Sequence, residues 1–384
     1  MNLFRCCLTG LVLSLCSSGP LRAQTEASDL NVFGYFQPQF YYETDSGTSP
    51  AQNSFVLQQL NLFLQKDLSP KLTSFVNFEA VNSFSSDQEW GSFRLEEAWA
   101  RYRYSHSLSV KVGLQIPIFN NLNEIKNRTP VIPYVVRPLV YESSFVDVIP
   151  IRVFVPQQAF VQAFGWVPLR NLKLDYAAYL GNTELVNSGF NVGQDGRPIG
   201  QTGVDTTKSV LVGGRAGIRY GELKTGFSAT FDRSAVFRGA DEIPELVAGH
   251  YDNIRRRRMG ADASYYLHGL YFEAEWIDVS FDEPEELELG LSFYYVTAGY
   301  RITDQLLGYI GYWTTEERVR ILGDRQSVDI RTPVIGAAYT LEDQITLKAA
   351  YAHVGVDVDF TGSIAEFTGT ETFDYFTVAV SVAF

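Results

Sequence analysis

The residue types that most often carry out catalysis or bind metals are scarce in this chain. Its four histidines lie far apart, and none has another histidine four positions later, which excludes a zinc site on one helical face. The three cysteines all fall within the first 16 residues, so the remainder has no disulfide and no thiolate nucleophile or ligand. We expect no catalytic residue, metal or cofactor, and hence no enzyme. The histidines are His106, His250, His268 and His353.

Charged residues instead alternate with apolar ones along several stretches. In the stretch 210–220, Arg215 and Arg219 share one face of an extended strand, whereas Val212 and Ile218 fall on the other face. Such strands place their charges on one side only, which predicts that the charged sides share an aqueous space. The residues predicted to line that space are Arg101, Arg103, Lys111, Arg215, Arg219, Lys224, Arg258, Lys348, Glu273 and Glu275.

The last strand of the chain indicates which medium the apolar sides meet. Between Asp374 and Phe384, one face is wholly apolar with an aromatic residue at each end, and the other is small and mildly polar. A strand that crosses a bilayer needs about 9–11 residues with this alternation and aromatic residues at both interfaces. A charge at the lipid face near the midplane costs about 2–4 kcal/mol. The charged sides must therefore line a water-filled lumen.

The connections between the strands alternate in length. Segments of 10–14 residues with strand character follow one another almost end to end, joined by short and long connections in turn. Outer-membrane barrels have short periplasmic turns, long extracellular loops and an even number of strands. The sequence thus predicts an all-β fold, a 16-stranded antiparallel transmembrane β-barrel in the cell outer membrane. The predicted short turns are 69–71, 105–107, 169–171, 221–222, 268–269, 303–304 and 341–343.

Four of the predicted strands alternate poorly or change phase midway. A β-bulge or a subunit interface would each account for this, and the pattern does not choose between them. These strands are 91–104, 158–168, 289–302 and 326–340.

The connection 119–157 is unusually long for a loop and unusually apolar. Loops above roughly 12–15 residues are commonly functional or disordered, and an apolar loop must bury itself. Because barrels of 16–18 strands leave an aqueous channel, we expect this loop to fold inside and constrict the channel. Packing over a neighbouring subunit, or standing outside the barrel, is the alternative. The charges expected to shape the constriction are Glu124, Lys126, Arg128, Arg137, Glu142, Asp147 and Arg152.

The N-terminal segment 1–23 has the features of a secretory signal peptide. Arg5 precedes an apolar run that is too short to span a bilayer, and small residues precede Gln24. Cys16 lies in a sequence that resembles a lipobox, but Leu15 stands where a small residue is expected. We therefore expect a cleaved peptide followed by a single barrel domain over 24–384. The net charge of −13 argues against a nucleic-acid partner, which requires a basic surface.

Two local motifs indicate a resemblance to a known protein family. The segments Leu95–Tyr104 and Lys111–Phe119, together with the long third outer loop and the terminal Phe384, resemble Gram-negative outer-membrane porins, closest to the phosphate-selective porin O/P type. The resemblance implies ion transport by passive diffusion of small hydrophilic solutes, a homotrimer, and recognition of Phe384 by the barrel-assembly machinery. It does not imply phosphate selectivity, because that subtype depends on a dense arginine ladder that this chain interrupts with acids.

Two other functions remain open at this stage. A substrate-specific channel for an anion such as phosphate would use the basic residues as guides, and a barrel-anchored surface adhesin or structural protein would have a plugged lumen. The lumen charges either create a transverse field or neutralise one another across strands.

Two charged runs lie at strand ends outside the lumen. Arg255 and Arg257 are predicted to face outward, where they would bind lipopolysaccharide phosphates or simply be solvated. The acidic run 282–288 either chelates divalent cations or forms an ordinary solvated loop. Outer-membrane lipid and lipopolysaccharide are thus expected partners.

Overall fold

The computed structural model describes residues 30–46, 50–85, 87, 90–142, 154–183, 209–234, 254–282, 287–321, 324–361 and 366–384. Asn31–Phe384 form one compact unit. Within the described residues, the unit is built of strands and one short 3-10 helix, η1 (Leu139–Tyr141). The strands are β1 (Asn31–Glu43), β2 (Gln52–Ser69), β3 (Leu72–Ser85), β4 (Trp90–Arg103), β5 (Ser109–Gln115), β6 (Ala159–Leu169), β7 (Leu172–Asn182), β8 (Val210–Tyr220), β9 (Leu223–Ser234), β10 (Ile254–Leu267), β11 (Leu270–Asp282), β12 (Leu287–Arg301), β13 (Leu306–Ile321), β14 (Asp324–Glu342), β15 (Ile345–Thr361) and β16 (Glu366–Ala383).

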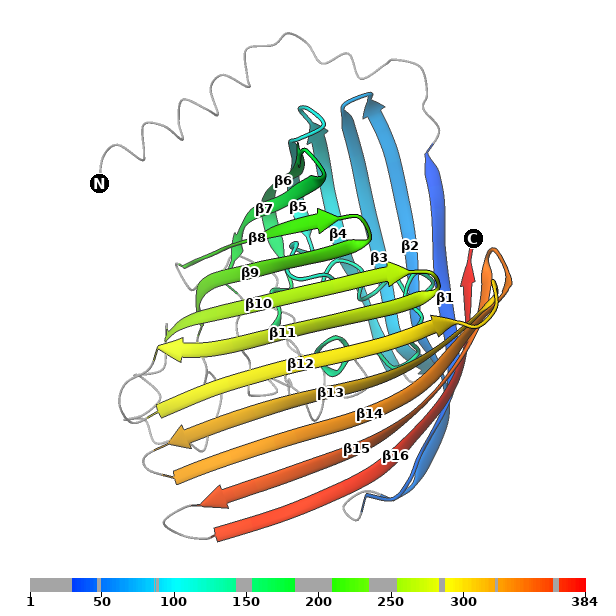
Figure 1. Ribbon diagram of the computed structural model, residues 1–384, viewed down its shortest axis with the longest axis vertical. Coiled ribbons are helices and arrows are strands. Elements are labelled where there is room, and N and C mark those ends of the chain that lie inside the picture. The colour runs from blue at the N-terminus through cyan, green and yellow to red at the C-terminus, as the bar shows by residue number, and fades with distance from the viewer. Residues whose placement is uncertain are drawn as a thin grey trace. The chain divides into compact units, whose positions relative to one another are not determined.

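These sixteen strands close into a barrel, as the sequence predicts (Figure 1). Each strand pairs antiparallel with its sequence neighbours, and β16 returns to pair with β1, with Tyr35 opposite Ala383. Backbone hydrogen bonds in both directions between Gly34 and Phe384, at 2.9 and 3.0 Å, complete the closure. The terminal residue thus belongs to the seam of the barrel, and each of the sixteen described strands pairs with a strand on either side.

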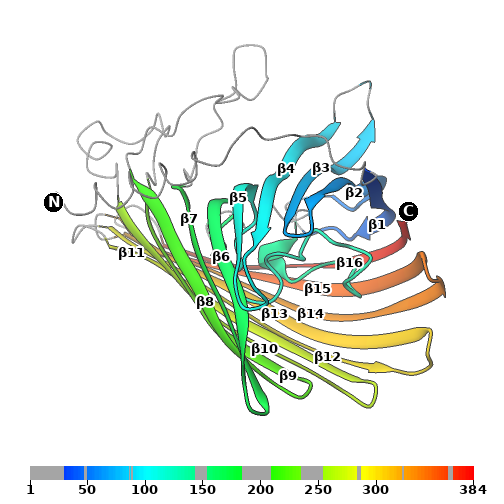
Figure 2. The ribbon, with the colours of Figure 1, turned by 90° about the horizontal axis from the view of Figure 1, so that it is seen from above.

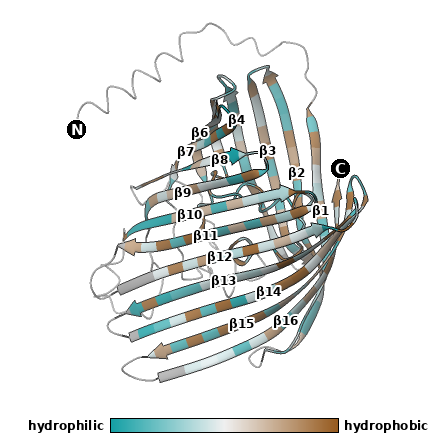
Figure 3. Cartoon of the chain, in the orientation of Figure 1, coloured by the Kyte–Doolittle hydropathy of each residue, from teal (hydrophilic) through white to brown (hydrophobic). Residues whose placement is uncertain are grey.

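Hydrophilic and hydrophobic residues alternate along many of the strands (Figure 3), and the outward-facing residues have the composition that a bilayer requires. On β16, Phe376, Val378 and Val380 are exposed to the outside, as is Phe384 just after it, whereas Thr377 and Ser381 face inward and are buried. Exposed aromatic residues form two rows on the outside, as interfacial girdles do. One row lies near the middle of the strands and consists of Trp276, Tyr294, Tyr312, Tyr351 and Phe376; the other lies near the short turns and consists of Tyr220, Tyr265, Tyr300, Tyr339 and Phe384.

The short turns lie where the sequence predicts them. β2 and β3, for example, are joined at residues 70–71, and β6 and β7 at residues 170–171.

No helix in the described part of the chain is long and apolar enough to cross a membrane.

A β-bulge accounts for the irregular pattern of β4. Asn77 on β3 pairs with Glu97, but the next residue, Phe78, pairs with Leu95, so Glu96 is the extra residue. A further register shift lies between β5 and β6, near Val112 and Gln115. An inserted residue moves every following side chain to the opposite face, which is why strict alternation fails there.

The loop between β5 and β6 lies inside the ring of strands over its described parts, 116–142 and 154–158 (Figure 2). Its apolar side chains form one buried core with the inner faces of β10–β16. Tyr134 packs edge-on against Tyr309, at 5.3 Å between ring centroids, and Phe154 packs edge-on against Phe293. This contact explains why apolar and polar residues alternate poorly along β12 and β14. The outer faces of these strands meet lipid and their inner faces meet an apolar loop, so both faces carry apolar residues.

Polar contacts fix the loop to separate parts of the inner wall. On β11, the Glu275 carboxylate accepts hydrogen bonds from the backbone N–H groups of Asn121 and Leu122, both at 2.8 Å, and from the Tyr141 hydroxyl at 2.6 Å. On β15, the Lys348 ammonium donates to the carbonyls of Thr129 and Ile132.

On the β1–β3 side, amides hold the loop backbone. The Gln58 side chain donates to the Val135 carbonyl at 3.1 Å, and the Gln59 side chain donates to the Asn127 carbonyl at 2.7 Å. The loop is therefore anchored at three places around the lumen.

Gly260 on β10 permits a close approach of the loop to the wall. A Cβ at this position would lie 2.4 Å from Oδ1 of Asn120, far inside contact distance. Asn120 has a φ of 51°, donates its backbone N–H to Ser228 at 2.9 Å and donates its side-chain amide to the Trp276 carbonyl at 3.3 Å. A side chain on residue 260 would collide with the Asn120 side chain at the first turn of the loop.

Candidate functional site

A polar cavity of about 520 Å³ lies inside the barrel, between the start of the loop and the inner faces of β4–β9. Ser105 and His106, which belong to the short turn after β4, line one end of it. Because short turns mark the periplasmic side of outer-membrane barrels, this cavity opens at that side. We call it the periplasmic vestibule. Its other lining residues are Arg101, Arg103, Ser109, Ile118, Asn120, Asn121, Glu124, Phe164, Gly165, Trp166, Asp175, Tyr176, Arg215, Arg219 and Lys224.

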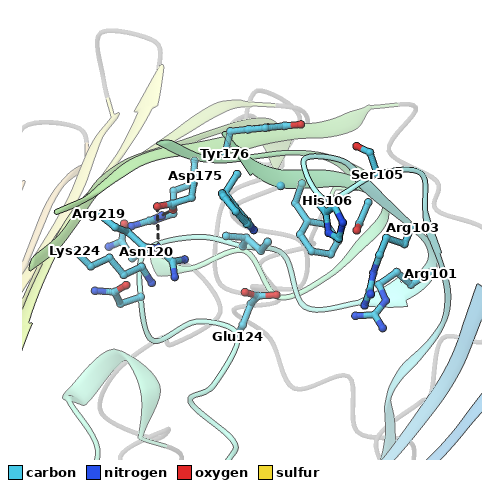
Figure 4. Close-up of a pocket in the computed structure, with 17 residues that line it drawn as sticks. Arg101, Arg103, Ser105, His106, Asn120, Glu124, Asp175, Tyr176, Arg219 and Lys224 are labelled. Atoms are coloured by element: carbon cyan, nitrogen blue, oxygen red, sulfur yellow. Dashed lines mark hydrogen bonds and ion pairs between the residues drawn. The ribbon is translucent and has the colours of Figure 1, made fainter. Parts of the chain in front are cut away.

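Cations occupy two opposite walls of the vestibule (Figure 4). Arg101 and Arg103 lie together on β4, because they are two residues apart in a strand and share its inner face. Arg219 and Lys224 lie across from them, on β8 and β9, and pair in register next to the turn that joins those strands. Glu124 of the loop lies between the two groups.

A buried ion cluster supports the wall formed by β7, β8 and β10. Arg215 binds Asp262 through two hydrogen bonds, Nε to Oδ2 at 2.9 Å and Nη2 to Oδ1 at 2.6 Å, and also binds Asp175. Arg219 donates to the other oxygen of Asp175 at 3.1 Å. Such forked, charge-assisted pairs hold the guanidinium plane in one orientation. Arg215 is therefore a structural ion at the edge of the vestibule, with little charge left for a solute.

Gly226 makes room for the Arg215 side chain. A Cβ on this residue of β9 would lie 2.2 Å from Nη2 of Arg215, so only glycine lets the guanidinium lie flat across the strand. The bidentate pair with Asp262 depends on that position.

The loop side of the vestibule carries one cation–carboxylate pair in an aromatic setting. Nζ of Lys111 lies 3.7 Å from Oε1 of Glu124. The same ammonium lies 4.7 Å from the ring centroid of Trp99 and 5.3 Å from that of Phe164. Contact with two aromatic rings orients the lysine towards the loop. This pair spans the gap between β5 and the loop.

The charge balance of the vestibule is positive. Among the described residues, five lysines and arginines but only two carboxylates line it, Glu124 and Asp175. Adding the direct partners Lys111 and Asp262 brings one charge of each sign and leaves an excess of three positive charges. Lys224 has no ion-pair partner among the described residues, and the Arg219 side chain is 51% exposed. The described lining of the cavity is therefore net positive in an otherwise acidic protein.

Several residues predicted to line the lumen lie instead beneath the loop. Lys348 is only 3% exposed, and its charge is surrounded by loop carbonyls. Glu273 is buried and accepts hydrogen bonds from the hydroxyls of Tyr271 and Tyr295. Glu275 anchors the loop, as described above. The alternation of apolar and polar residues correctly predicts that Lys348, Glu273 and Glu275 face inward, but the loop buries all three away from the aqueous lumen.

Arg258 also faces inward but is fully buried. It lies 3.5 Å from the Asp232 carboxylate, which Arg256 binds as well. By contrast, Arg101, Arg103, Arg215, Arg219 and Lys224 line the vestibule, and Lys111 contacts its acidic loop residue.

The predicted constriction charges separate in a similar way. Arg137 and Glu142 are buried and pair with each other inside the loop, where Arg137 also donates to the Lys126 carbonyl at 2.9 Å. Lys126 is buried as well and donates to Asn123 and Gln157. These three charges stabilise the fold of the loop, because a loop inside a barrel must satisfy its own polar groups.

Of the other predicted constriction charges, Glu124 reaches the vestibule and Arg128 is exposed. Asp147 and Arg152 lie outside the described residues. The prediction did not include Asn120, Asn121 or Trp166, which also line the vestibule. The positive φ of Asn120 and its contact at Gly260 depend on tertiary structure and leave no periodic signal in the sequence.

Comparisons with known proteins support the fold. No family model matches the chain, and no curated protein matches it in sequence. Among solved structures, a loop-deletion mutant of OmpT, an outer membrane protein of Vibrio cholerae, has a TM-score of 0.59 at 10% identity, over 94% of this chain and all of that one. The anion-selective porin from Comamonas acidovorans has a TM-score of 0.58 at 12% identity, over 93% of this chain and 99% of that one.

A third structure is the outer membrane channel DcaP of Acinetobacter baumannii. It has a TM-score of 0.57 at 11% identity, over 94% of this chain and 99% of that one. The fold is that of a multi-pass outer-membrane β-barrel. At these identities the likeness concerns the fold, so function has to be argued from the site.

Proposed function

We propose that this chain is an outer-membrane porin, a channel for passive diffusion of small hydrophilic solutes and ions, with a preference for anions. The observation that carries the proposal is the periplasmic vestibule, a charged cavity inside a barrel of sixteen strands. Barrels of this size enclose more space than their own side chains fill. The position of the loop leaves polar and charged residues, rather than apolar ones, on the β4–β9 side.

The loop supports a channel rather than a plugged anchor. Its apolar residues pack against β10–β16 and its polar contacts reach β2, which leaves the cavity on the β4–β9 side. On the opposite side, Arg219 and Glu124 keep exposed side chains, at 51% and 35%. An adhesin or structural anchor with a sealed lumen would have no use for exposed charges at this depth, where each charge requires water.

The preference for anions follows from the uneven charge of the vestibule. Two arginines on one wall and an arginine and a lysine on the other face a passing solute, while Asp175 and Asp262 are committed to Arg215. A ring of cationic side chains raises the local concentration of anions and lowers that of cations. The name of the Comamonas acidovorans porin describes that protein as anion-selective.

The test is conductance of the full-length mature chain, refolded and reconstituted in planar bilayers under a KCl gradient. We expect discrete steps, a current that rises linearly with salt and voltage, and a reversal potential displaced towards that of chloride. A current that saturates as the phosphate concentration rises would indicate a phosphate-specific channel rather than a general porin. Absence of current from correctly folded protein would contradict the proposal and favour the anchor.

Further parts of the proposal concern maturation and assembly. Residues 1–23 act as a cleaved signal peptide, Phe384 is recognised by the barrel-assembly machinery, and the channel is a homotrimer without enzymatic activity. One structural neighbour, OmpT of Vibrio cholerae, is described as a trimer form. Mass spectrometry of the mature chain and light scattering of the detergent-solubilised protein test cleavage and assembly separately.

A further inference from the structure

A second basic site lies on the outside of the barrel, near the ends of β9 and β10 that face the long loops. Arg255 and Arg257 are exposed on the outer face of β10, and Arg233 on β9 pairs in register with Arg255. Like charges placed directly opposite each other across strands destabilise a sheet. Neither Arg233 nor Arg257 has an ion-pair partner among the residues that the structure describes.

The described side chains around this site are mostly cationic. Behind the backbone, Arg256 and Arg258 both bind Asp232. On β11, Asp278 lies in register with Met259. Among the described side chains of this region, five arginines therefore outnumber the two aspartates Asp232 and Asp278.

An apolar groove adjoins the arginines. Val210, Val212 and Phe231 are exposed on the outer face, Phe231 to 51%, and they line a groove of about 750 Å³ together with Arg233, Arg255 and Arg257. Phe231 pairs in register with both Val212 and Arg257, so the aromatic ring lies between the aliphatic floor and the cations. One ligand that fits this groove has an anionic head and an apolar body.

The site also lies at the correct level for such a ligand. On β9 the outer face changes from Phe231 to Arg233, and on β10 it changes from Met259 to Arg257, which marks the upper boundary of the apolar band. The phosphates of an outer-leaflet lipid lie at this boundary, and its acyl chains lie just below. Guanidinium groups bind phosphate oxygens in a fork.

We propose that Arg233, Arg255 and Arg257 form a binding site for the phosphorylated headgroup of lipid A, with its acyl chains on Val210, Val212 and Phe231. The site faces away from the lumen and does not depend on the transport activity.

The test uses the refolded full-length mature protein in non-ionic detergent, with diphosphoryl lipid A, monophosphoryl lipid A and inorganic pyrophosphate as probes in native mass spectrometry. We expect diphosphoryl lipid A to bind most tightly and pyrophosphate not to bind measurably. The double variant R233Q/R257Q should weaken lipid A binding by about tenfold or more, since each charge-assisted phosphate contact is worth about that factor. The matched control R101Q/R103Q removes two arginines from the lumen and should leave lipid binding unchanged.

Equal lipid A binding by R233Q/R257Q and the unaltered protein would overturn the proposal. Binding of pyrophosphate as tight as that of lipid A would also overturn it, because the groove would then contribute nothing. If the double variant does not fold, the single variants R233Q and R257Q are measured, each with a smaller expected loss. Conductance of R233Q/R257Q, expected to be unchanged, separates failure of this site from failure of the channel.

Discussion

At the scale of single residues, Arg215 differs from the other vestibule cations because it is buried between two carboxylates. Replacement by glutamine would leave Asp175 and Asp262 without their common partner. Removal of one member of a buried ion cluster commonly costs about 3–5 kcal/mol. We expect R215Q to lower the free energy of unfolding by that amount, measured by urea titration of tryptophan fluorescence in detergent micelles.

Arg219 provides the control for this prediction, because it binds the same Asp175 but is half exposed. Exposed ion pairs contribute about 0–1 kcal/mol, so R219Q should shift the unfolding midpoint only slightly. Similar losses for the two variants would contradict the assignment of Arg215 as a structural ion.

Tyr141 provides a second prediction at this scale. Burial raises the pKa of its hydroxyl well above the usual value, and the nearby Glu275 carboxylate adds to the effect. Because the folded-state pKa exceeds that of the unfolded chain, the stability gained from this hydroxyl is complete below the unfolded pKa. It is lost only as the pH rises through the higher folded-state pKa.

The absorbance of tyrosinate at 295 nm checks this prediction. The difference spectrum between the unaltered protein and Y141F should show no ionisation of Tyr141 up to about pH 10, the usual pKa of tyrosine, and ionisation only above it. Titration of Tyr141 in the range of a free tyrosine would show that it does not donate to Glu275 in solution. Y141F should also cost about 1.5–3 kcal/mol, the worth of a hydrogen bond to a charged group.

At the scale of elements, the contact between the loop and β10 depends on Gly260. In G260V the added side chain would collide with Asn120 and push the start of the loop away from the wall, towards the vestibule that Asn120 and Asn121 line. We expect a lower single-channel conductance and a loss of about 1–3 kcal/mol, as overpacking usually costs. Planar-bilayer recordings and urea titration measure the two effects.

Gly290 on β12 is the matched control, because a Cβ there would meet nothing within 4 Å. G290A should have the conductance and stability of the unaltered protein. If G260V conducts like G290A, the loop is not held at this contact in the open channel.

The strands could be predicted from the sequence because lipid and water impose a period of two residues on them. The pattern of β16, apolar outside and small inside, depends only on the two media and needs no knowledge of tertiary contacts. The environment of the inward-facing residues could not be predicted where the apolar loop, rather than water, contacts the inner face of the barrel. Phe293 and Tyr295 on β12 are buried against it, and neither residue pattern nor strand length records which inner face receives a loop.

The same limit applies to the candidate site. Alternation identifies Lys348 and Lys224 equally as inward-facing residues, yet one is covered by loop carbonyls and the other lines the vestibule. Likewise, Arg137 and Glu142 are close enough in sequence to pair with each other, which withdraws both charges from the lumen. Burial by a long loop is a property of the whole fold, and single residues carry no signal of it.

At the scale of the whole molecule, the apolar half of the lumen and the charged half are separated. The loop and β10–β16 share one buried core, whereas the cations on β4, β8 and β9 surround the vestibule. Under the proposed function, a solute would pass along the side of the barrel where the vestibule lies, next to these charged groups. The field there is a sum over several residues and acts at a distance, unlike a contact site that binds one solute.

This distinction predicts how selectivity depends on salt. The screening length of a field falls from about 10 Å at 0.1 M to about 3 Å at 1 M ionic strength. If the preference for anions arises from the summed excess of three positive charges, the reversal potential should correspond to clear chloride preference at 0.1 M. It should approach that of a non-selective pore at 1 M, at the same ratio of concentrations across the bilayer. A preference that is equal at both salt concentrations would instead indicate direct coordination of the anion, since contact pairs are screened far less than a field across an open lumen.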